Sequence, residues 1–267
     1  MPAIAELLTT HLYLFTLVLA RVGGLVITAP MFSALAVPKN VRGVMGFALA
    51  LLIAPTQTHI AIAAPTTSID WVLALAVELL LGLALGLGTA ILVGGAQLAG
   101  QLIAQLSGLS LAEVFDPNLG ATVPLFSQLL GLFSVAVYLL IGGHRWLLAG
   151  LLESFRALPP GGGHLPAEVS HTLVSIMTEG FSLGIRVAVP AIVALLLATI
   201  ILGLLSRTMT QLNVMSLGFG LNALVAFGAL AISLGSAAYL FEDEFQPAIS
   251  RLLDAVGPSS AAVSGNH

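Results

Sequence analysis

The chain has 267 residues, of which 58% are hydrophobic and only 7% are charged, whereas about 25% charged residues is usual in soluble domains. With a mean hydropathy of +1.08 and only 8 basic and 12 acidic side chains, it is expected to be an integral membrane protein or part of a membrane-associated assembly. The absence of cysteine excludes disulfides and thiolate metal sites, and the net charge of −4 argues against nucleic-acid binding.

The N-terminal stretch MPAIAELLTTHL has no Lys or Arg and no small-residue cleavage site, so we expect mature sequence entering a helix. The first apolar run, Leu12–Ala29, has Arg21 at its centre. The second run, Val44–Ala54, is about 16 Å long as a helix, against about 30 Å for a bilayer core. It spans a membrane only if it continues past Pro55 with a kink.

The third run, Trp71–Gly95, is long enough to cross a membrane and contains Glu78. Small residues recur along it at every fourth position, which favours close approach of another helix backbone. These residues are Gly82, Gly86, Ala90 and Gly94.

An amphipathic helix is expected next, near residues 97–107. Gln97, Gln101 and Gln105 share one of its faces, and lipid offers their amides no partner. Two interpretations remain open: a hydrogen-bonded seam between helices and a water-lined path.

The stretch Gly108–Pro124 separates these runs from the second half of the chain. Asp116-Pro117-Asn118 indicates a turn. The preceding residues are nevertheless strongly apolar and must be buried against something, because water does not favour them. They are Leu109, Leu111, Val114 and Phe115.

The second half contributes three further runs, which are Leu125–Ile141 with its extension to Leu152, Phe181–Leu205 and Val214–Phe241. Pro159–Gly163 is the clearest linker, and the acidic Glu242–Glu244 is expected to end the last run. We predict an all-α protein with about six long hydrophobic segments arranged as helical hairpins. Residues 1–267 are expected to form one domain, with a flexible tail from about residue 246.

Three charged residues lie within apolar runs: Arg21, Glu78 and Arg186. Each charge costs roughly 2.5–3.5 kcal/mol at a helix centre in a membrane, so we expect Glu78 to pair with Arg21 or Arg186. The pair either fixes helix register or takes part in transport. A proton relay is disfavoured because only one acid lies within a helix.

Signals for an enzyme are weak. Gly108–Leu111 has the loose form GxSx, which an intramembrane serine protease could use through Ser110 with His59, His144 or His171 as base. No HExxH, P-loop or dinucleotide-binding motif occurs. We therefore expect no enzymatic activity, no cofactor and no metal site.

Four stretches resemble the FliR family of flagellar export-gate proteins, which has counterparts in injectisome type III secretion systems. They are residues 19–43, LARVGGLVITAPMFSALAVPKNVRG; 108–132, GLSLAEVFDPNLGATVPLFSQLLGL; 142–159, GGHRWLLAGLLESFRALP; and 184–222. The resemblance extends over most of the chain, in order and at fitting separations.

The resemblance implies a core subunit of the flagellar type III protein export gate, in the bacterial inner membrane at the flagellar basal body. Such proteins form a cone-shaped gate with FliP-like and FliQ-like subunits, largely above the plane of the bilayer. Unfolded flagellar proteins pass through it, and an FlhB-like protein clasps the entrance. Membrane lipid is a further expected partner.

In that family the loop matching residues 108–124 projects into the pore. We therefore expect Leu109–Phe115 to form a hydrophobic plug, with Asp116 and Pro117 setting the turn. The alternative is static docking of these residues against a neighbouring subunit. A second class of function, a stand-alone small-solute transporter or channel, would use broken helices at Pro55, Pro190 and Asn222.

Overall fold

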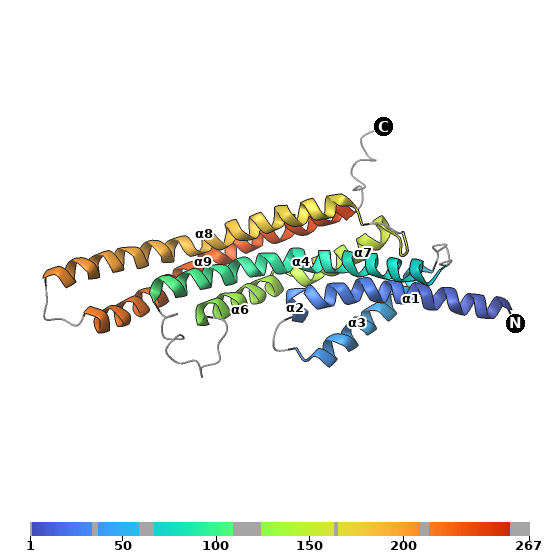
Figure 1. The fold of residues 1–267 in the computed structure, drawn as a ribbon, viewed down its shortest axis with the longest axis horizontal. Coiled ribbons are helices and arrows are strands. Elements are labelled where there is room, and N and C mark those ends of the chain that lie inside the picture. Colours follow the sequence, from blue (N-terminus) through green and yellow to red (C-terminus); the bar gives the residue numbers. More distant parts are fainter. Residues whose placement is uncertain are drawn as a thin grey trace, which may run out of the picture. The chain divides into compact units, whose positions relative to one another are not determined.

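The computed structural model describes residues 2–33, 37–58, 67–108, 124–162, 165–208 and 214–256, and every regular element among them is helical (Figure 1). The α-helices are α1 (Pro2–Thr28), α2 (Pro30–Ser33), α3 (Lys39–Ile53), α4 (Ser68–Ser107), α6 (Leu125–Leu140), α7 (Gly143–Ala157), α8 (Ala167–Thr208) and α9 (Val214–Val256). A 3₁₀ turn, η1 (Ala54–Gln57), follows α3. The all-α prediction is thus confirmed for the described residues.

Local sequence explains where several helices begin and end. Before α4, Thr67 and Asp70 form a capping box, in which each side chain accepts a hydrogen bond from the other residue's N–H, at 3.0 and 3.2 Å. Pro55 ends α3 because proline lacks the N–H that the next helical turn requires. Gly108 follows α4 with φ of 77°, a left-handed conformation that a side chain would disfavour.

Close contacts divide the chain into two compact units. The first comprises Met1–Ala90, Gly142–Met177 and Phe245–His267, and the second comprises Ile91–Ile141 and Thr178–Glu244. Helices α4, α8 and α9 contribute residues to both units. The single-domain assignment therefore stays a prediction, and each unit is described by itself.

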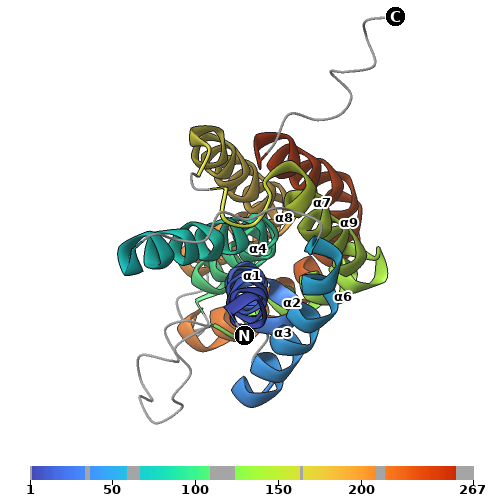
Figure 2. The same ribbon diagram turned by 90° about the vertical axis from the view of Figure 1, so that its right-hand side faces the viewer.

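In the first unit, α1 lies between α3 and the first part of α4 (Figure 2). Helices α1 and α4 run in the same direction, since Arg21 faces Gly82 while Thr28, further along α1, faces Gly86. Thr28 Oγ1 donates a hydrogen bond to the Leu83 carbonyl at 3.3 Å. Helix α3 packs on α1 through Phe15 and Phe47, whose ring centroids are 5.5 Å apart.

In the second unit, the second part of α4 forms an antiparallel pair with α6. Ser127 Oγ donates a hydrogen bond to the Gln97 carbonyl at 2.9 Å, and the Gln97 side chain lies over Gly131. Helices α8 and α9 are also antiparallel, because Leu202 lies near Gly218 while Arg186 lies near Glu244. In each of these two pairs the helices therefore run in opposite directions.

Not every packed pair is a hairpin, however. Besides α1 with α4, the second part of α4 runs parallel to α8, since Gly180 faces Ile91 and Gly184 faces Leu98. Glycine makes both contacts possible, because a Cβ at Gly180 would lie 2.9 Å from the Ile91 carbonyl oxygen. These parallel pairs join helices that are distant in sequence.

The structure changes the sequence-based segment list. Residues 97–107 are not a separate amphipathic helix but the end of α4, whose 40 residues continue without a break. The Val44–Ala54 run is the short α3 followed by η1. Helix α9 continues through Glu242–Glu244 to Val256, so residues 246–256 are helical rather than a flexible tail.

The count of membrane segments also changes. Among the described residues, four helices are long and apolar enough to cross a membrane, and a fifth is added if the broken pair α6 and α7 counts as one span. The four are Thr9–Thr28, Ser68–Ser107, Ala167–Thr208 and Gly220–Ala255. The expectation of about six long hydrophobic segments is therefore confirmed only in part, with four or five candidate spans among the described residues.

Candidate functional site

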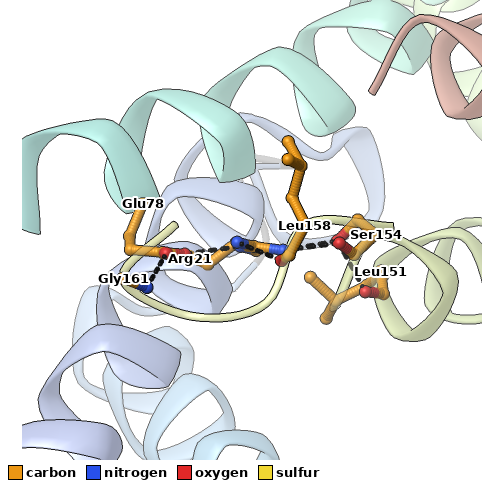
Figure 3. A network of polar contacts seen from close by, with 6 residues as sticks. All are labelled: Arg21, Glu78, Leu151, Ser154, Leu158 and Gly161. Carbon is orange, nitrogen blue, oxygen red and sulfur yellow. Dashed lines mark hydrogen bonds and ion pairs between the residues drawn. The ribbon is translucent and has the colours of Figure 1, made fainter. Parts of the chain in front are cut away.

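The most highly connected polar site lies in the first unit, around Arg21 (Figure 3). The Arg21 side chain is 0% exposed and that of Glu78 is 2% exposed. Arg21 Nε donates to Glu78 Oε2 at 2.6 Å. The sequence left open which arginine pairs with Glu78. In the structure it is Arg21, and this ion pair joins α1 to α4.

The rest of the Arg21 guanidinium is bound by α7 and the residue that follows it. Nη1 donates to the Ser154 carbonyl at 2.9 Å and to Ser154 Oγ at 3.2 Å, and Nη2 donates to the Leu158 carbonyl at 3.0 Å. The Phe155 ring lies beneath the guanidinium, with its centroid 4.3 Å from Arg21 Cζ. This contact adds a cation–π attraction in a site without water competition.

Glu78 is likewise engaged through both oxygens. Its Oε1 accepts a hydrogen bond from the Gly161 N–H at 2.9 Å. Gly161 has φ of 81°, a conformation that suits glycine and points this N–H toward the carboxylate. The structure describes the Pro159–Gly163 linker up to Gly162. Gly161 joins this part of the linker to the buried ion pair.

Three glycines let the two backbones approach closely enough for the pair to form. A Cβ on Gly82 would overlap the Arg21 carbonyl, and a Cβ on Gly24 would overlap the Leu79 carbonyl. A Cβ on Gly86 would lie 2.9 Å from the Ala29 nitrogen. The predicted small-residue stripe thus packs α4 against α1 at Gly82 and Gly86, while a Cβ on Gly94 would meet nothing within 4 Å.

This network can hold four chain segments in register, and both oxygens of its carboxylate already accept a hydrogen bond. The carboxylate accepts from Arg21 and Gly161, and the guanidinium donates four hydrogen bonds. Removing one partner of such a pair would leave an uncompensated buried charge, at a cost of about 3–5 kcal/mol. The arrangement therefore favours fixing helix register over transport.

Arg186 has a different partner. Its Nη1 lies 3.6 Å from Glu244 Oε1, with the two side chains 59% and 24% exposed. In the structure Glu78 pairs with Arg21 and Arg186 pairs with Glu244, so the alternative that paired Arg186 with Glu78 is not the one observed. Because this second pair is partly exposed, its contribution to stability is small.

The glutamine face lies on the second part of α4. All three side chains are exposed in this chain, and that of Gln97 lies over Gly131 of α6. Gln101 and Gln105 project away from the chain's own core. The structure leaves both interpretations open, a seam with another subunit and a water-lined path.

The predicted plug residues lie outside the described residues, as does Ser110 of the GxSx pattern. These plug residues are Leu109, Leu111, Val114, Phe115, Asp116 and Pro117. The structure describes their boundaries: Gly108 ends α4, and Pro124 immediately precedes α6 at Leu125. Within the described residues, no group of three or more His, Asp or Glu side chains is placed to hold a metal ion.

Sequence reasoning missed several partners in these sites. Ser154, Leu158 and Gly161 contribute two backbone carbonyls, one hydroxyl and one backbone N–H, and backbone groups carry no residue-type signal. The sequence does carry a signal that places Glu244 within a helix. Phe241, Phe245, Ala248 and Leu252 recur at helical spacing and are all buried, which indicates that the helix continues through the acidic residues.

The fold and these sites define a helical membrane protein whose helices are joined by small-residue contacts and a buried ion pair. Comparison with known proteins is more specific. The family profile of bacterial export proteins, family 1, matches residues 12–248.

Three relatives share this similarity over most of their length, and each is a flagellar biosynthetic protein FliR. The protein of Escherichia coli strain K12 is 31% identical over 239 residues, covering 89% of this chain and 90% of the relative. That of Aquifex aeolicus strain VF5 is 28% identical over 240 residues, covering 89% and 92%. That of Pectobacterium carotovorum is 30% identical over 217 residues, covering 80% and 81%.

The chain belongs to the bacterial export proteins, family 1, the family of FliR. The resemblance inferred from the sequence is thereby confirmed. The chain is a component of the flagellar biosynthesis and export apparatus, and its apolar helices indicate a membrane location.

Proposed function

We propose that this chain is a core subunit of the flagellar type III protein export gate in the bacterial inner membrane, at the flagellar basal body. In this proposal it forms, with FliP-like and FliQ-like subunits, the channel through which unfolded flagellar proteins leave the cell. An FlhB-like protein acts at the entrance. Family membership supports the export role, and one structural observation supports the shared channel.

That observation is the length of the uncovered apolar surface on α8. Large apolar side chains are exposed from Met177, at 65%, to Leu205, at 44%, with Phe181, Val193 and Ile200 between them. At 1.5 Å per residue, this stretch is about 42 Å long.

This stretch is longer than the hydrocarbon core of a bilayer. The hydrocarbon core is about 30 Å thick, and a helix tilted by about 40°, the upper end of the usual range, would keep only about 39 Å within it. In this proposal neighbouring subunits cover the remainder, because a water-exposed apolar surface of this size is costly. A channel assembled from several subunits provides such neighbours, which supports it over a monomeric transporter.

The glutamine face fits the same proposal. Gln101 and Gln105 are exposed on α4, and amides in contact with lipid would lack hydrogen-bond partners. We place this face toward the water-filled channel or toward a polar seam with the next subunit. Either position requires assembly.

We further propose that residues 108–124 help to close the channel. Leu109, Leu111, Val114 and Phe115 are apolar enough to exclude water from a narrow opening. Both ends of the segment are helix termini, α4 at Ser107 and α6 at Leu125. Anchored helix ends would hold such a plug in place.

The assembly is tested by co-purification. The full chain carrying an affinity tag, expressed with its FliP-like and FliQ-like partners and extracted in mild detergent, should elute as one stable hetero-oligomer. A monodisperse monomer that binds a small solute would instead support the stand-alone transporter.

The plug is tested by ion leak across the membrane of cells that contain the assembled complex. Deleting residues 110–116 should increase the leak, and so should replacing Leu109, Leu111, Val114 and Phe115 by serine, which preserves loop length. Ser110→Ala is the control in the same loop and should change neither leak nor motility. An intact complex without added leak would show that these residues only dock against a neighbour.

A further inference from the structure

The exposed face of α8 changes character along the helix. Near its start, in the first unit, the exposed residues include the polar Glu168 and His171. In the second unit, the exposed residues from 189 to 205 are apolar except for Thr199. The Thr199 hydroxyl donates within the helix to the Leu195 carbonyl at 2.8 Å, so it needs no partner outside the helix.

Helix α9 shows the reverse order. Its large exposed side chains between Leu221, at 41%, and Ile232, at 66%, are apolar, whereas Asp243 and Gln246 are exposed further along the helix. Because α8 and α9 are antiparallel in the second unit, the apolar parts of their exposed faces lie at the same end of the pair.

A charged pair marks the level at which both faces change. Arg186 Nη1 lies 3.6 Å from Glu244 Oε1, and the Arg186 side chain is 59% exposed. Tyr239, in the preceding part of α9, is 80% exposed. Charged groups and an exposed tyrosine at the end of an apolar face are typical of the boundary between a membrane and water.

Two prolines add polar backbone groups at this level. Pro190 lies four residues after Arg186 in α8, and Pro247 lies four residues after Asp243 in α9. Proline has no N–H, so it cannot donate the helical hydrogen bond to the carbonyls of Arg186 and Asp243. Such carbonyls are costly in hydrocarbon, whereas water in the headgroup region can donate to them.

The length of the apolar part matches a bilayer. Between Arg186 and Arg207, α8 has 20 residues without a charge. At 1.5 Å per residue they are about 30 Å long, which is the thickness of the hydrocarbon core. Gly220–Tyr239 of α9 has the same length, and Arg207 is exposed at the far end of the stretch in α8.

We propose that lipid acyl chains cover the exposed faces of residues 187–206 in α8 and Gly220–Tyr239 in α9, with the pair of Arg186 and Glu244 in the headgroup region. The hydrocarbon core therefore ends at this pair, although the candidate spans of the two helices extend over 42 and 36 residues. The proposal requires the membrane location and does not depend on the export channel.

Large apolar side chains are also exposed before this boundary, among them Met177 and Phe181 of α8, at 65% and 58%. In the channel proposed above, neighbouring subunits cover them. This part of the assignment alone rests on the proposed function.

Spin labels on single cysteines test the lipid contact, since the chain has no native cysteine. The full chain, with any co-purified subunits, is reconstituted into vesicles of phosphatidylcholine and phosphatidylglycerol. Power-saturation EPR compares the access of each label to oxygen, which concentrates in acyl chains, and to nickel ethylenediaminediacetate, which stays in water. Leu197→Cys, at the middle of the stretch, should give the highest ratio of oxygen access to nickel access.

The ratio should fall toward both ends of the stretch. Val189→Cys and Leu204→Cys lie about 12 Å and 11 Å from position 197 along the helix, so their ratios should be lower. Ile232→Cys, on the exposed face of α9, should resemble Leu197→Cys. His171→Cys and Ser250→Cys are matched controls at exposed polar positions of the same two helices, where nickel access should be several-fold higher.

Two results at the centre of the stretch would overturn the proposal. One is a label at position 197 that the nickel reagent reaches as readily as the label at position 171, which would place water there. The other is a label at position 197 that neither reagent reaches, which would show that protein covers it. Oxygen-rich labels at positions 171 and 250 would also overturn it, because the hydrocarbon would then extend past the charged pair.

Phe181→Cys separates this proposal from the export channel. Nickel access at position 181 would contradict cover by neighbouring subunits but agree with the boundary at Arg186. A label that neither reagent reaches would support both. A high ratio of oxygen access to nickel access would place acyl chains before the charged pair and contradict the boundary.

Discussion

At the scale of single residues, Arg21 is the most deeply buried charged side chain among the described residues. It is completely buried in an apolar helix, yet its charge is balanced by Glu78 and its N–H groups are bound by Ser154 and Leu158. A buried pair of this kind contributes little net stability compared with apolar side chains of equal size. Its value lies in specificity, because it joins only the segments that supply all these partners.

This view predicts a non-additive double-mutant cycle at the ion pair. Arg21→Met or Glu78→Leu alone should destabilise the full chain by about 3–5 kcal/mol, because each leaves the other charge buried and unpaired. The double variant should recover most of that loss. Reversible unfolding by SDS in detergent micelles measures all three variants.

Arg156 provides the matched control for this cycle. It pairs with Glu153 at 3.0 Å, but the two side chains are 78% and 51% exposed, so Arg156→Met should change stability by less than about 1 kcal/mol. If the double variant at Arg21 and Glu78 lost as much stability as the two single variants combined, the register role of the pair would be wrong.

At the scale of helices, glycines determine which pairs pack backbone to backbone. Gly82 and Gly86 of α4 face α1, whereas Gly94, from the same sequence stripe, has no described neighbour within 4 Å of a Cβ. Regular spacing therefore predicts a smooth helix face, but not which part of that face is used within the chain.

Gly82→Ala should destabilise the chain strongly, since its Cβ would overlap the Arg21 carbonyl and backbone cannot move as readily as a side chain. We expect a loss of about 3 kcal/mol, at the upper end of overpacking effects. Gly94→Ala should be neutral or stabilise by up to about 1 kcal/mol through helix propensity. Equal losses for the two in SDS unfolding would contradict this assignment of contacts.

At the scale of the whole molecule, the described chain leaves much of its apolar surface uncovered. On α8 only 28% of the most apolar 18-residue window is buried within the chain, compared with 56% on α4. Lipid or protein must cover the remainder, since water would penalise it at about 25 cal/mol for each Å².

Cysteine labelling can measure directly whether lipid or protein covers the apolar face of α8, because the chain has no native cysteine. Ile200→Cys, on the apolar face of α8, should resist a water-soluble maleimide in open membrane fragments and react after denaturation in SDS. Glu168→Cys, in the exposed first turn of α8, should react before denaturation. Immediate labelling at position 200 would mean that water, rather than lipid or protein, lies against this face.

The sequence alone determined the helical class, the membrane location and the family, because these depend on composition, on long apolar runs and on motifs that survive divergence. It also identified Arg21 and Glu78 as costly charges that need partners. It placed the end of the last helix wrongly at Glu242–Glu244, although the apolar spacing through Phe241, Phe245 and Leu252 continues beyond them.

Only the tertiary structure decided which charges pair and which glycines touch. Arg21 and Arg186 look alike in the sequence, but α1 and α4 meet in parallel at Gly82 and bring Glu78 to the first, while α9 brings Glu244 to the second. The remaining partners of Arg21 are mostly backbone carbonyls. Every residue has a carbonyl, so only the path of the chain in space selects those that bind.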